Sequence, residues 1–238
     1  MNAQEFGDGL VPLQTIDGVS YAVALTTHPW DLPADALAIS VGASYGGVGE
    51  AMQEEFPRAA WRRVDLGSIT AAEPAVLDLS AHTGGRRLRL AVLATPHDRS
   101  NGDYPTADAI TTATTTAITT AASAGASAVA LPLFATGRLG LDASIAARAV
   151  IHGALAAKSD VREVILFSDY SVNVDAIRKQ WAAYVPGSAA FPEPESTASE
   201  PSPVPGCRCS PTTSSLVVSP ATWSTRTRAS RWPMTTSA

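Results

Sequence analysis

Four glycines lie close together in the segment SVGASYGGVGEAM (residues 40–52), between an apolar run and a run with helical spacing. Glycine adopts positive φ and lets another group approach the main chain, so four glycines indicate either a very tight turn or a bound ligand. The unpaired N–H groups and the dipole at the start of the next helix favour an anion. The segment therefore predicts an anion-binding turn, and a purely structural turn is the alternative.

A second turn of the same kind is ATGRLG (residues 135–140), which follows another apolar run. Thr136 supplies a hydroxyl group, and Gly137 and Gly140 supply a flexible backbone beside it. The first turn lacks both the G-x-G-x-x-G spacing of dinucleotide sites and the Gly-Lys-Ser/Thr ending of a P-loop. Two such turns at one edge of a sheet are nevertheless able to hold two linked phosphates between them.

Acid–base chemistry has one pair of candidates, His97 and Asp98, in the segment TPHDRSNGD. They follow a predicted strand, where a proton donor and acceptor could assist hydrolysis, and a plain polar loop is the alternative. The histidines are scattered without the spacing of a metal site, so we predict no metal and no cofactor. No serine occupies the G-x-S-x-G pattern of a nucleophile elbow, which leaves a Ser–His–Asp hydrolase unsupported.

For the two turns to lie side by side and share a ligand, the strands before them must end at the same edge of a sheet. Apolar runs predict strands at 19–27, 35–42, 75–81, 88–95, 126–134 and 162–169. Helical spacing predicts helices from 49 to about Pro57, and at 106–125, 141–158 and 174–185. The alternation indicates an α/β protein with a largely parallel sheet covered by helices on both faces. Ligands of such sheets bind at the carboxyl ends of the strands, where both turns are predicted to lie.

The segment 106–125 contains many threonines, which favour strands by propensity. Its apolar residues nevertheless recur at helical spacing, and we predict that one face is buried. The residues of that face are Ile110, Ala113, Thr114, Ala117, Ile118 and Ala121. Pro105 suits the first turn of a helix and Gly125 suits its end, so a helix is predicted, with the other threonines exposed or packed on small residues.

The charge of the chain is asymmetric. Residues 201–238 contain four arginines and no acid, which gives them a formal charge of +4. The formal net charge of the whole chain is −5, so residues 1–200 carry −9. An acidic domain repels phosphate backbones, which argues against nucleic-acid binding. No apolar run approaches the length of a membrane helix and no signal peptide is recognised, so we expect no membrane association and a cytoplasmic location. Cys207 and Cys209 are one residue apart, and we assign them no function.

Composition changes near the C-terminus. We predict one domain at 1–188, a linker rich in Pro, Ser and Glu at 189–206, and a disordered tail at 207–238. A second interpretation of 207–238 is a reading-frame shift in a GC-rich gene, because one shifted frame of a GC-rich back-translation becomes acidic and aliphatic. In that case the natural protein would continue into a C-terminal effector domain.

The two turns and their neighbours resemble the macro domain family, whose members bind ADP-ribose and related nucleotides. The resemblance covers residues 10–185 and rests on three collinear segments. These are YGGVGEAM, ALPLFATGRLGLDASIAARAVIHGAL and VREVILFSDYSVNVDAIRKQW. It implies a three-layer α/β/α fold with a mixed, largely parallel central sheet.

The resemblance also implies roles for individual residues. Asp31 would accept a hydrogen bond from the adenine amino group, and Phe167 or Tyr170 would pack on the adenine ring. The remaining predicted ligand contacts, in the two turns, are Gly46, Gly47, Val48 and Gly49 at the diphosphate, and Thr136, Gly137, Arg138, Leu139 and Gly140 over the diphosphate and the distal ribose.

This sequence departs from the family pattern at several points. The first glycine of the late loop is here Ala135, and Asp31 follows Trp30 in place of a glycine. The Asn-rich strand end that contacts the distal ribose is here SVGAS, with only Ser40 and Ser44 as polar side chains. We therefore expect a binding module for ADP-ribose or a related NAD-derived nucleotide diphosphate, acting as a sensor. Its partner would be the free nucleotide or an ADP-ribosylated protein. An ADP-ribosyl hydrolase and a degenerate domain without ligand are the alternatives.

Overall fold

The computed structural model describes residues 9–42, 44–45, 47–57, 61, 64–98, 104–137 and 139–185. The predicted linker and tail, with Cys207 and Cys209, lie outside these residues, as do Gly46 and Arg138. Among the described helices, none combines the length and the apolar character that a membrane crossing requires.

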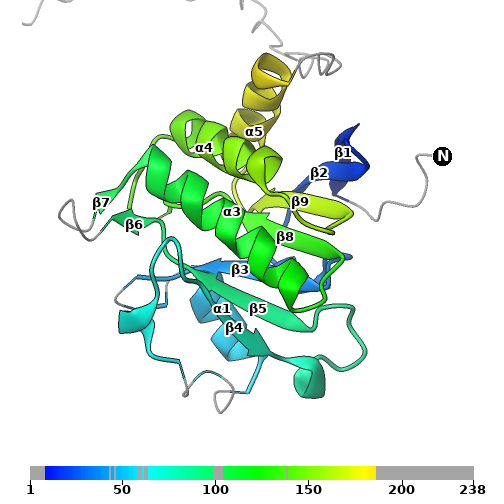
Figure 1. Ribbon diagram of the computed structural model, residues 1–238, viewed down its shortest axis with the longest axis vertical. Helices are drawn as coiled ribbons and strands as arrows, with labels where there is room; N and C mark the ends of the chain where they lie inside the picture. The colour runs from blue at the N-terminus through cyan, green and yellow to red at the C-terminus, as the bar shows by residue number, and fades with distance from the viewer. Residues whose placement is uncertain are drawn as a thin grey trace, which may run out of the picture. The chain divides into compact units, whose positions relative to one another are not determined.

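Seven strands form one sheet in the order β1-β2-β9-β8-β3-β5-β4 (Figure 1). Their bounds are Leu10–Ile16 (β1), Val19–Leu25 (β2), Ala36–Ser40 (β3), Ala75–Asp78 (β4), Leu90–Ala94 (β5), Ala128–Pro132 (β8) and Glu163–Ser168 (β9). The two outermost pairs, β1 with β2 and β4 with β5, are antiparallel, whereas the inner pairs are parallel. The predicted mixed, largely parallel sheet is confirmed. Two short strands, β6 (His97–Asp98) and β7 (Tyr104–Pro105), form a separate ribbon.

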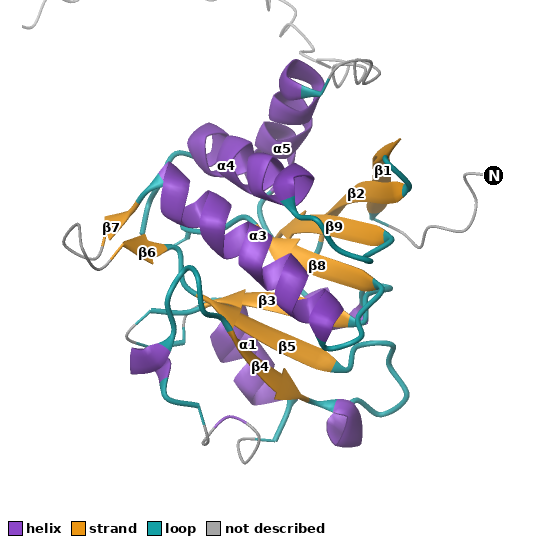
Figure 2. Ribbon diagram, viewed as in Figure 1, coloured by secondary structure: helices purple, strands orange, loops and turns teal. Residues whose placement is uncertain are grey.

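Helices cover both faces of the sheet (Figures 1 and 2). One core contains the buried residues of α3 (Ala107–Ser123), α4 (Ala143–Ala156) and α5 (Ser171–Tyr184). The other core contains Met52 of α1 (Val48–Glu55) together with Phe56 and Trp61. Short 3₁₀ helices lie at Pro29–Asp31, Leu66–Ser68 and Ser80–His82. The predicted three layers are therefore present, and α1 ends before Pro57 as expected.

The threonine-rich segment is the helix α3, and the six residues predicted for its inner face are all buried. The hydroxyl group of the N-cap Thr106 accepts a hydrogen bond from the N–H of Ala109. Pro105 lies in β7, before the cap, and not in the first turn as expected. Two threonines bind the neighbouring helix α4: Thr111 Oγ1 donates to Ala149 O at 3.2 Å, and Thr115 Oγ1 donates to Gly153 O at 2.9 Å.

One carboxylate joins three strands at the amino edge of the sheet. Asp35 Oδ2 accepts hydrogen bonds from Ser127 N, Ser127 Oγ and Ala128 N at 2.8, 2.6 and 3.0 Å. Its Oδ1 accepts from Arg87 Nε at 3.2 Å. Burial by itself would raise the pKa of Asp35, but the bonds from Ser127, Arg87 and Ala128 outweigh it and lower the pKa to about 2.

At Gly153, α4 packs closely against α3. A Cβ atom at Gly153 would lie 2.5 Å from Thr111 O and 2.7 Å from Thr114 Cβ, distances that real structures do not allow. We predict that Gly153→Ala destabilises the domain by about 1–3 kcal/mol, because the helices must separate. Urea unfolding measures this change. Alanine normally stabilises a helix relative to glycine, so a more stable variant would contradict the packing described here.

The lowered pKa of Asp35 makes stability depend on pH. Because the folded-state pKa lies below the ordinary value of 3.8, this contribution is complete above about pH 4 and is lost as the pH falls towards 2. We predict that unfolding experiments between pH 5 and 2 show a loss of about 2 kcal/mol from this group. Asp35→Asn should be less stable at pH 7 and should lack this part of the acid sensitivity. An unchanged pH profile in the variant would refute the assignment.

Candidate functional site

The site lies where two neighbouring strands separate. The parallel ladder between β3 and β8 pairs Ala36 with Val129 and Leu37 with Ala130, near the amino ends of the strands. Pro132, at the end of β8, has no N–H group to extend this ladder, although it still faces Phe167 of β9 in register. The carboxyl ends of β3 and β8 are therefore able to part, and a cavity of about 640 Å³ opens between them.

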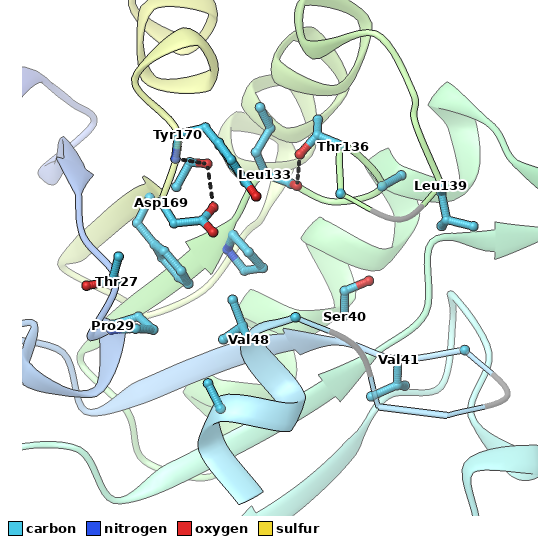
Figure 3. Close-up of a pocket in the computed structure, with 18 of the residues that line it drawn as sticks. Thr27, Pro29, Ser40, Val41, Val48, Leu133, Thr136, Leu139, Asp169 and Tyr170 are labelled. Atoms are coloured by element: carbon cyan, nitrogen blue, oxygen red, sulfur yellow. Dashed lines mark hydrogen bonds between the residues drawn. The ribbon is translucent and has the colours of Figure 1, made fainter. Parts of the chain in front are cut away.

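Most of the cavity wall comes from the carboxyl ends of β3, β8 and β9, the segments that follow β2, β3, β8 and β9, and the N-terminus of α1 (Figure 3). His97 of β6 and Pro29 of the first 3₁₀ helix also line it. The lining combines apolar residues, among them Val41, Leu133 and Phe167, with the hydroxyl-bearing residues Thr27 and Ser40. Among the described lining residues there is no Lys or Arg, and Asp169 is the sole carboxylate. An anion held at the described part of this cavity would therefore depend on backbone N–H groups.

The two glycine-containing turns face this cavity, as their predicted place at the carboxyl ends of strands requires. The predicted ligand contacts that line the cavity are Gly47, Val48, Thr136, Gly137, Leu139 and Phe167. The alternative adenine-packing residue, Tyr170, also lines it. Asp31, Gly49 and Gly140 are not among its lining residues, and Gly46 and Arg138 lie outside the described residues.

Gly47 and Gly49 need glycine for different reasons. Gly47 is the N-cap of α1, with φ 52° and ψ −111°, and a Cβ atom there would meet no heavy atom within 4 Å. Gly49 is buried, and its Cβ would lie 3.1 Å from Ile39 Cγ2 and 3.2 Å from Tyr45 Cδ1. The first glycine therefore shapes the turn and leaves open space beside it, whereas the second lets the helix pack against β3.

Ala135, which stands where the family pattern has the first glycine of the late loop, has φ 68°. This left-handed conformation is unusual for a residue with a side chain and stores about 1 kcal/mol of strain. The N–H of Leu141 donates to Ala135 O at 3.1 Å, and Gly140 N donates to Gly137 O at 3.0 Å. These bonds hold the turn in the shape that a glycine would adopt without strain.

Comparisons with known proteins connect this geometry to one fold. No family model matches the sequence, and no curated protein matches it. Solved structures do match. The Oceanobacillus iheyensis macrodomain with ADP has a TM-score of 0.61 and 13% identity, over 73% of this chain and 96% of that chain. The Trypanosoma brucei macrodomain in complex with ADP has a TM-score of 0.55 and 13% identity, over 67% and 68%. A point mutant of the Oceanobacillus protein with ADP-ribose has a TM-score of 0.51 and 12% identity, over 72% and 96%.

This chain has the macrodomain fold. The predicted resemblance in architecture is thereby confirmed. The sequence identity is too low for the roles of side chains in those structures to be assigned to residues of this chain. The role of each residue must be argued from its surroundings in this chain.

Asp31 illustrates that need. Its carboxylate accepts a hydrogen bond from Arg86 Nε at 2.9 Å, and Arg86 also contacts Glu55 Oε1 at 2.6 Å. Arg86 lies over the ring of Phe56 as well, with its Cζ atom 5.7 Å from the ring centroid. Asp31 thus belongs to an ion-pair cluster that joins its 3₁₀ helix to α1, apart from the residues that line the cavity.

His97 does line the cavity of this macrodomain fold. A Cβ atom at Gly42 would lie 3.1 Å from His97 Nε2, so the absence of a side chain at Gly42 makes room for the imidazole. Gly42 belongs to the SVGAS segment at the end of β3, and His97 follows the end of β5. The side chain of Asp98 lies outside the described residues. Within the described ranges, no three His, Cys, Asp or Glu side chains gather to hold a metal ion.

A buried amide that sequence analysis missed connects two walls of the cavity. Asn173 is 7% exposed, and its Nδ2 donates to Ser168 Oγ at 3.0 Å and to Thr136 Oγ1 at 3.3 Å. Thr136 Oγ1 in turn donates to Leu133 O at 3.0 Å (Figure 3). Asn173 therefore ties the turn after β8 to the turn after β9. Asn173 directly precedes the predicted helix at 174–185, so the sequence pattern gave no sign that its side chain is buried, whereas α5 begins at Ser171.

We predict that Asn173→Ala destabilises the domain by about 1–3 kcal/mol, because it removes the donor of two buried hydrogen bonds. The same variant should bind any ligand of the cavity more weakly, since the turn at Thr136 loses its anchor. Urea unfolding and calorimetry measure the two effects. Asp175→Ala, an exposed substitution on the same helix, is the control and should change stability by less than about 0.5 kcal/mol. Equal effects of the two substitutions would show that the amide is unimportant.

Proposed function

We propose that this domain is a binding module for ADP-ribose or a closely related adenine nucleotide diphosphate. The observation that carries the proposal is the pair of turns at one cavity. Gly47 and Val48 begin α1 on one side, and Thr136 and Gly137 follow β8 on the other. The helix N-terminus offers unpaired N–H groups and a favourable dipole to a diphosphate placed between them.

The form of the cavity supports a ligand of this size and mixed character. Its volume of about 640 Å³ falls within the usual range for small-molecule sites, and its lining contains both apolar and hydroxyl-bearing residues. Phe167 offers a buried aromatic ring at the wall, which suits a flat base. The structural neighbours that were determined with ADP or ADP-ribose support the same ligand class.

Binding without turnover is the form of the proposal that the residues favour. Ser40 occupies the end of β3, and serine does not offer the amide of the Asn in the family pattern. The alternative, an ADP-ribosyl hydrolase, rests on His97, whose imidazole lines the cavity beside Gly42. The ligand would be the free nucleotide or ADP-ribose attached to a protein, in a cytoplasmic protein that senses it.

Isothermal titration calorimetry of the full chain with ADP-ribose, ADP, ATP and NAD tests the proposal. We predict saturable binding of ADP-ribose and an increase in thermal stability, of about 2.7 kcal/mol at 100 times the dissociation constant. If none of the four nucleotides binds, the proposed function is wrong and only the macrodomain fold stands. Release of ADP-ribose from a modified protein would establish the hydrolase instead.

A matched pair of glycine substitutions locates the site. Gly47→Val and Gly84→Val both place a branched side chain at positive φ, 52° and 61°, in open space. Both variants should therefore lose similar stability, but only Gly47 lines the cavity. We predict that Gly47→Val raises the dissociation constant at least about tenfold, or 1.4 kcal/mol, while Gly84→Val leaves it unchanged. Equal binding by the two variants would move the site elsewhere.

A further inference from the structure

Among the described residues that line the cavity, His97 is the one side chain that can become a cation. This part of the lining contains no Lys or Arg, and its one carboxylate belongs to Asp169. Histidine is the side chain that ordinarily changes charge between about pH 5 and 8, so an imidazole at the wall can be neutral or positive. The charge that the described wall presents to a ligand therefore depends on one residue.

The imidazole lies beside the chain that leads into α1. A Cβ atom at Gly42 would lie 3.1 Å from His97 Nε2 and 3.6 Å from its Cε1 atom, so the edge of the ring rests against the backbone there. An antiparallel bridge between Val41 and Tyr45 folds this segment back on itself. Gly47, the N-cap of α1, follows Tyr45 by two residues, a span of at most about 7 Å. His97 and the N-terminus of α1 therefore flank the same turn.

The backbone of His97 is held from two sides. Its N–H donates to Thr95 Oγ1 at 3.3 Å, and its strand β6 pairs it with Pro105 of β7. The helix α3 packs against the same strand. The side chain is half-buried and lines the cavity, so it reaches a ligand without a rearrangement of the chain.

Few charged groups surround the imidazole. The end of β3, from Ser40 to Gly42, contributes none. The titratable side chains of the neighbouring elements and of the remaining described lining are Tyr104 of β7, Asp108 of α3, Asp169 and Tyr170. Asp169 and Tyr170 lie on the far side of the view from Val41 (Figure 3). The side chain of Asp98 and residues 99–103 lie outside the described residues.

These surroundings make the charge of the imidazole depend on the ligand. The positive end of the α1 dipole opposes a second positive charge beside it. A bound anion removes this opposition, because an opposite charge within about 4–6 Å favours the charged form of a titratable group. The described carboxylates also favour the positive form. An anion that enters the turn therefore draws a proton from the solvent to the ring.

We propose that His97 binds the diphosphate as an imidazolium, so that binding of the nucleotide takes up a proton. This inference rests on the proposed function. An imidazolium donates hydrogen bonds from its ring nitrogens and adds a full positive charge to the N–H groups of α1. The proton comes from the solvent and stays on the ring, which distinguishes this role from acid–base assistance to hydrolysis. Affinity for the diphosphate rises as the pH falls, because more of the protein then carries the imidazolium.

Calorimetry of the full chain with ADP-ribose, in buffers that differ in ionisation enthalpy, measures the protons taken up. ADP-ribose suits this test because each of its phosphates is esterified and keeps one negative charge throughout the pH range. We predict uptake of about half a proton per ligand near pH 7. The dissociation constant at about pH 5.5 should be about five- to tenfold lower than at about pH 8. Both values lie above the range, below about pH 4, in which Asp35 loses its contribution to stability.

Two substitutions assign the proton to one residue. His97→Asn should bind ADP-ribose without proton uptake and with dissociation constants that agree within about twofold at the two pH values. His152→Asn is the matched control, because His152 is an exposed residue of α4 and does not line the cavity. It should keep both the proton uptake and the pH dependence of the wild-type protein. A melting temperature for each variant confirms that it is folded.

The outcomes separate this inference from the proposed function. If the wild-type protein does not bind ADP-ribose at either pH, the proposed function fails and the role of His97 fails with it. If it binds equally well at both pH values without proton uptake, the function stands and the role of His97 is overturned, whether or not the variants fold. Proton uptake that persists in His97→Asn, or that disappears in His152→Asn, overturns the assignment to His97 in the same way.

Discussion

The carboxylate of Asp35 constrains the positions of three strands at once. Its side chain accepts hydrogen bonds from the start of β8 and from Arg87 before β5, and its main chain pairs with Ala128, Arg89 and Leu90. These bonds join β8, β3 and β5 at their amino ends and set their relative register. A buried carboxylate with four hydrogen bonds favours one arrangement, because any shift would leave charge unpaired in the interior. The positions of the strand ends at the opposite edge follow from this anchor.

That opposite edge is where the cavity forms. β3 and β8 are held together by Asp35 and by two ladder pairs, and they part where Pro132 lacks an N–H group. Each strand then leads into a turn and a helix N-terminus, so the parting of the strands also separates two sets of backbone donors. Asn173 limits how far one wall can move, because its amide joins the turn at Thr136 to the turn at Ser168. The fold thus creates an opening, and one side chain joins the two turns on its β8 and β9 side.

Much of this arrangement could be predicted from local pattern. Apolar runs marked six of the seven strands of the main sheet, and helical spacing marked the buried face of α3 despite its threonines. The strand β1 was missed, because an edge strand that contains Pro12 and is half exposed lacks a strong apolar signal. Asp35 and Asn173 were missed as structural anchors because their partners are distant in sequence. The hydrogen bond between Asp31 and Arg86 could not be predicted for the same reason, because the two residues are 55 positions apart in the sequence. A local sequence pattern predicts whether a residue is buried or exposed, but contacts between residues distant in sequence are known only from the fold.

The division between backbone and side chains explains how this fold is retained at 12–13% identity to its structural neighbours. A cradle made of N–H groups at a helix N-terminus depends on chain path, so it tolerates almost any sequence that keeps a glycine such as Gly47 where the turn demands positive φ. Even Ala135 can hold the second turn, at the cost of some strain. Contacts made by side chains in the cavity are different, because each depends on one residue and can be supplied from any loop that reaches the cavity. The path of the backbone is therefore what the fold retains, and contacts made by single side chains are what each sequence must supply anew.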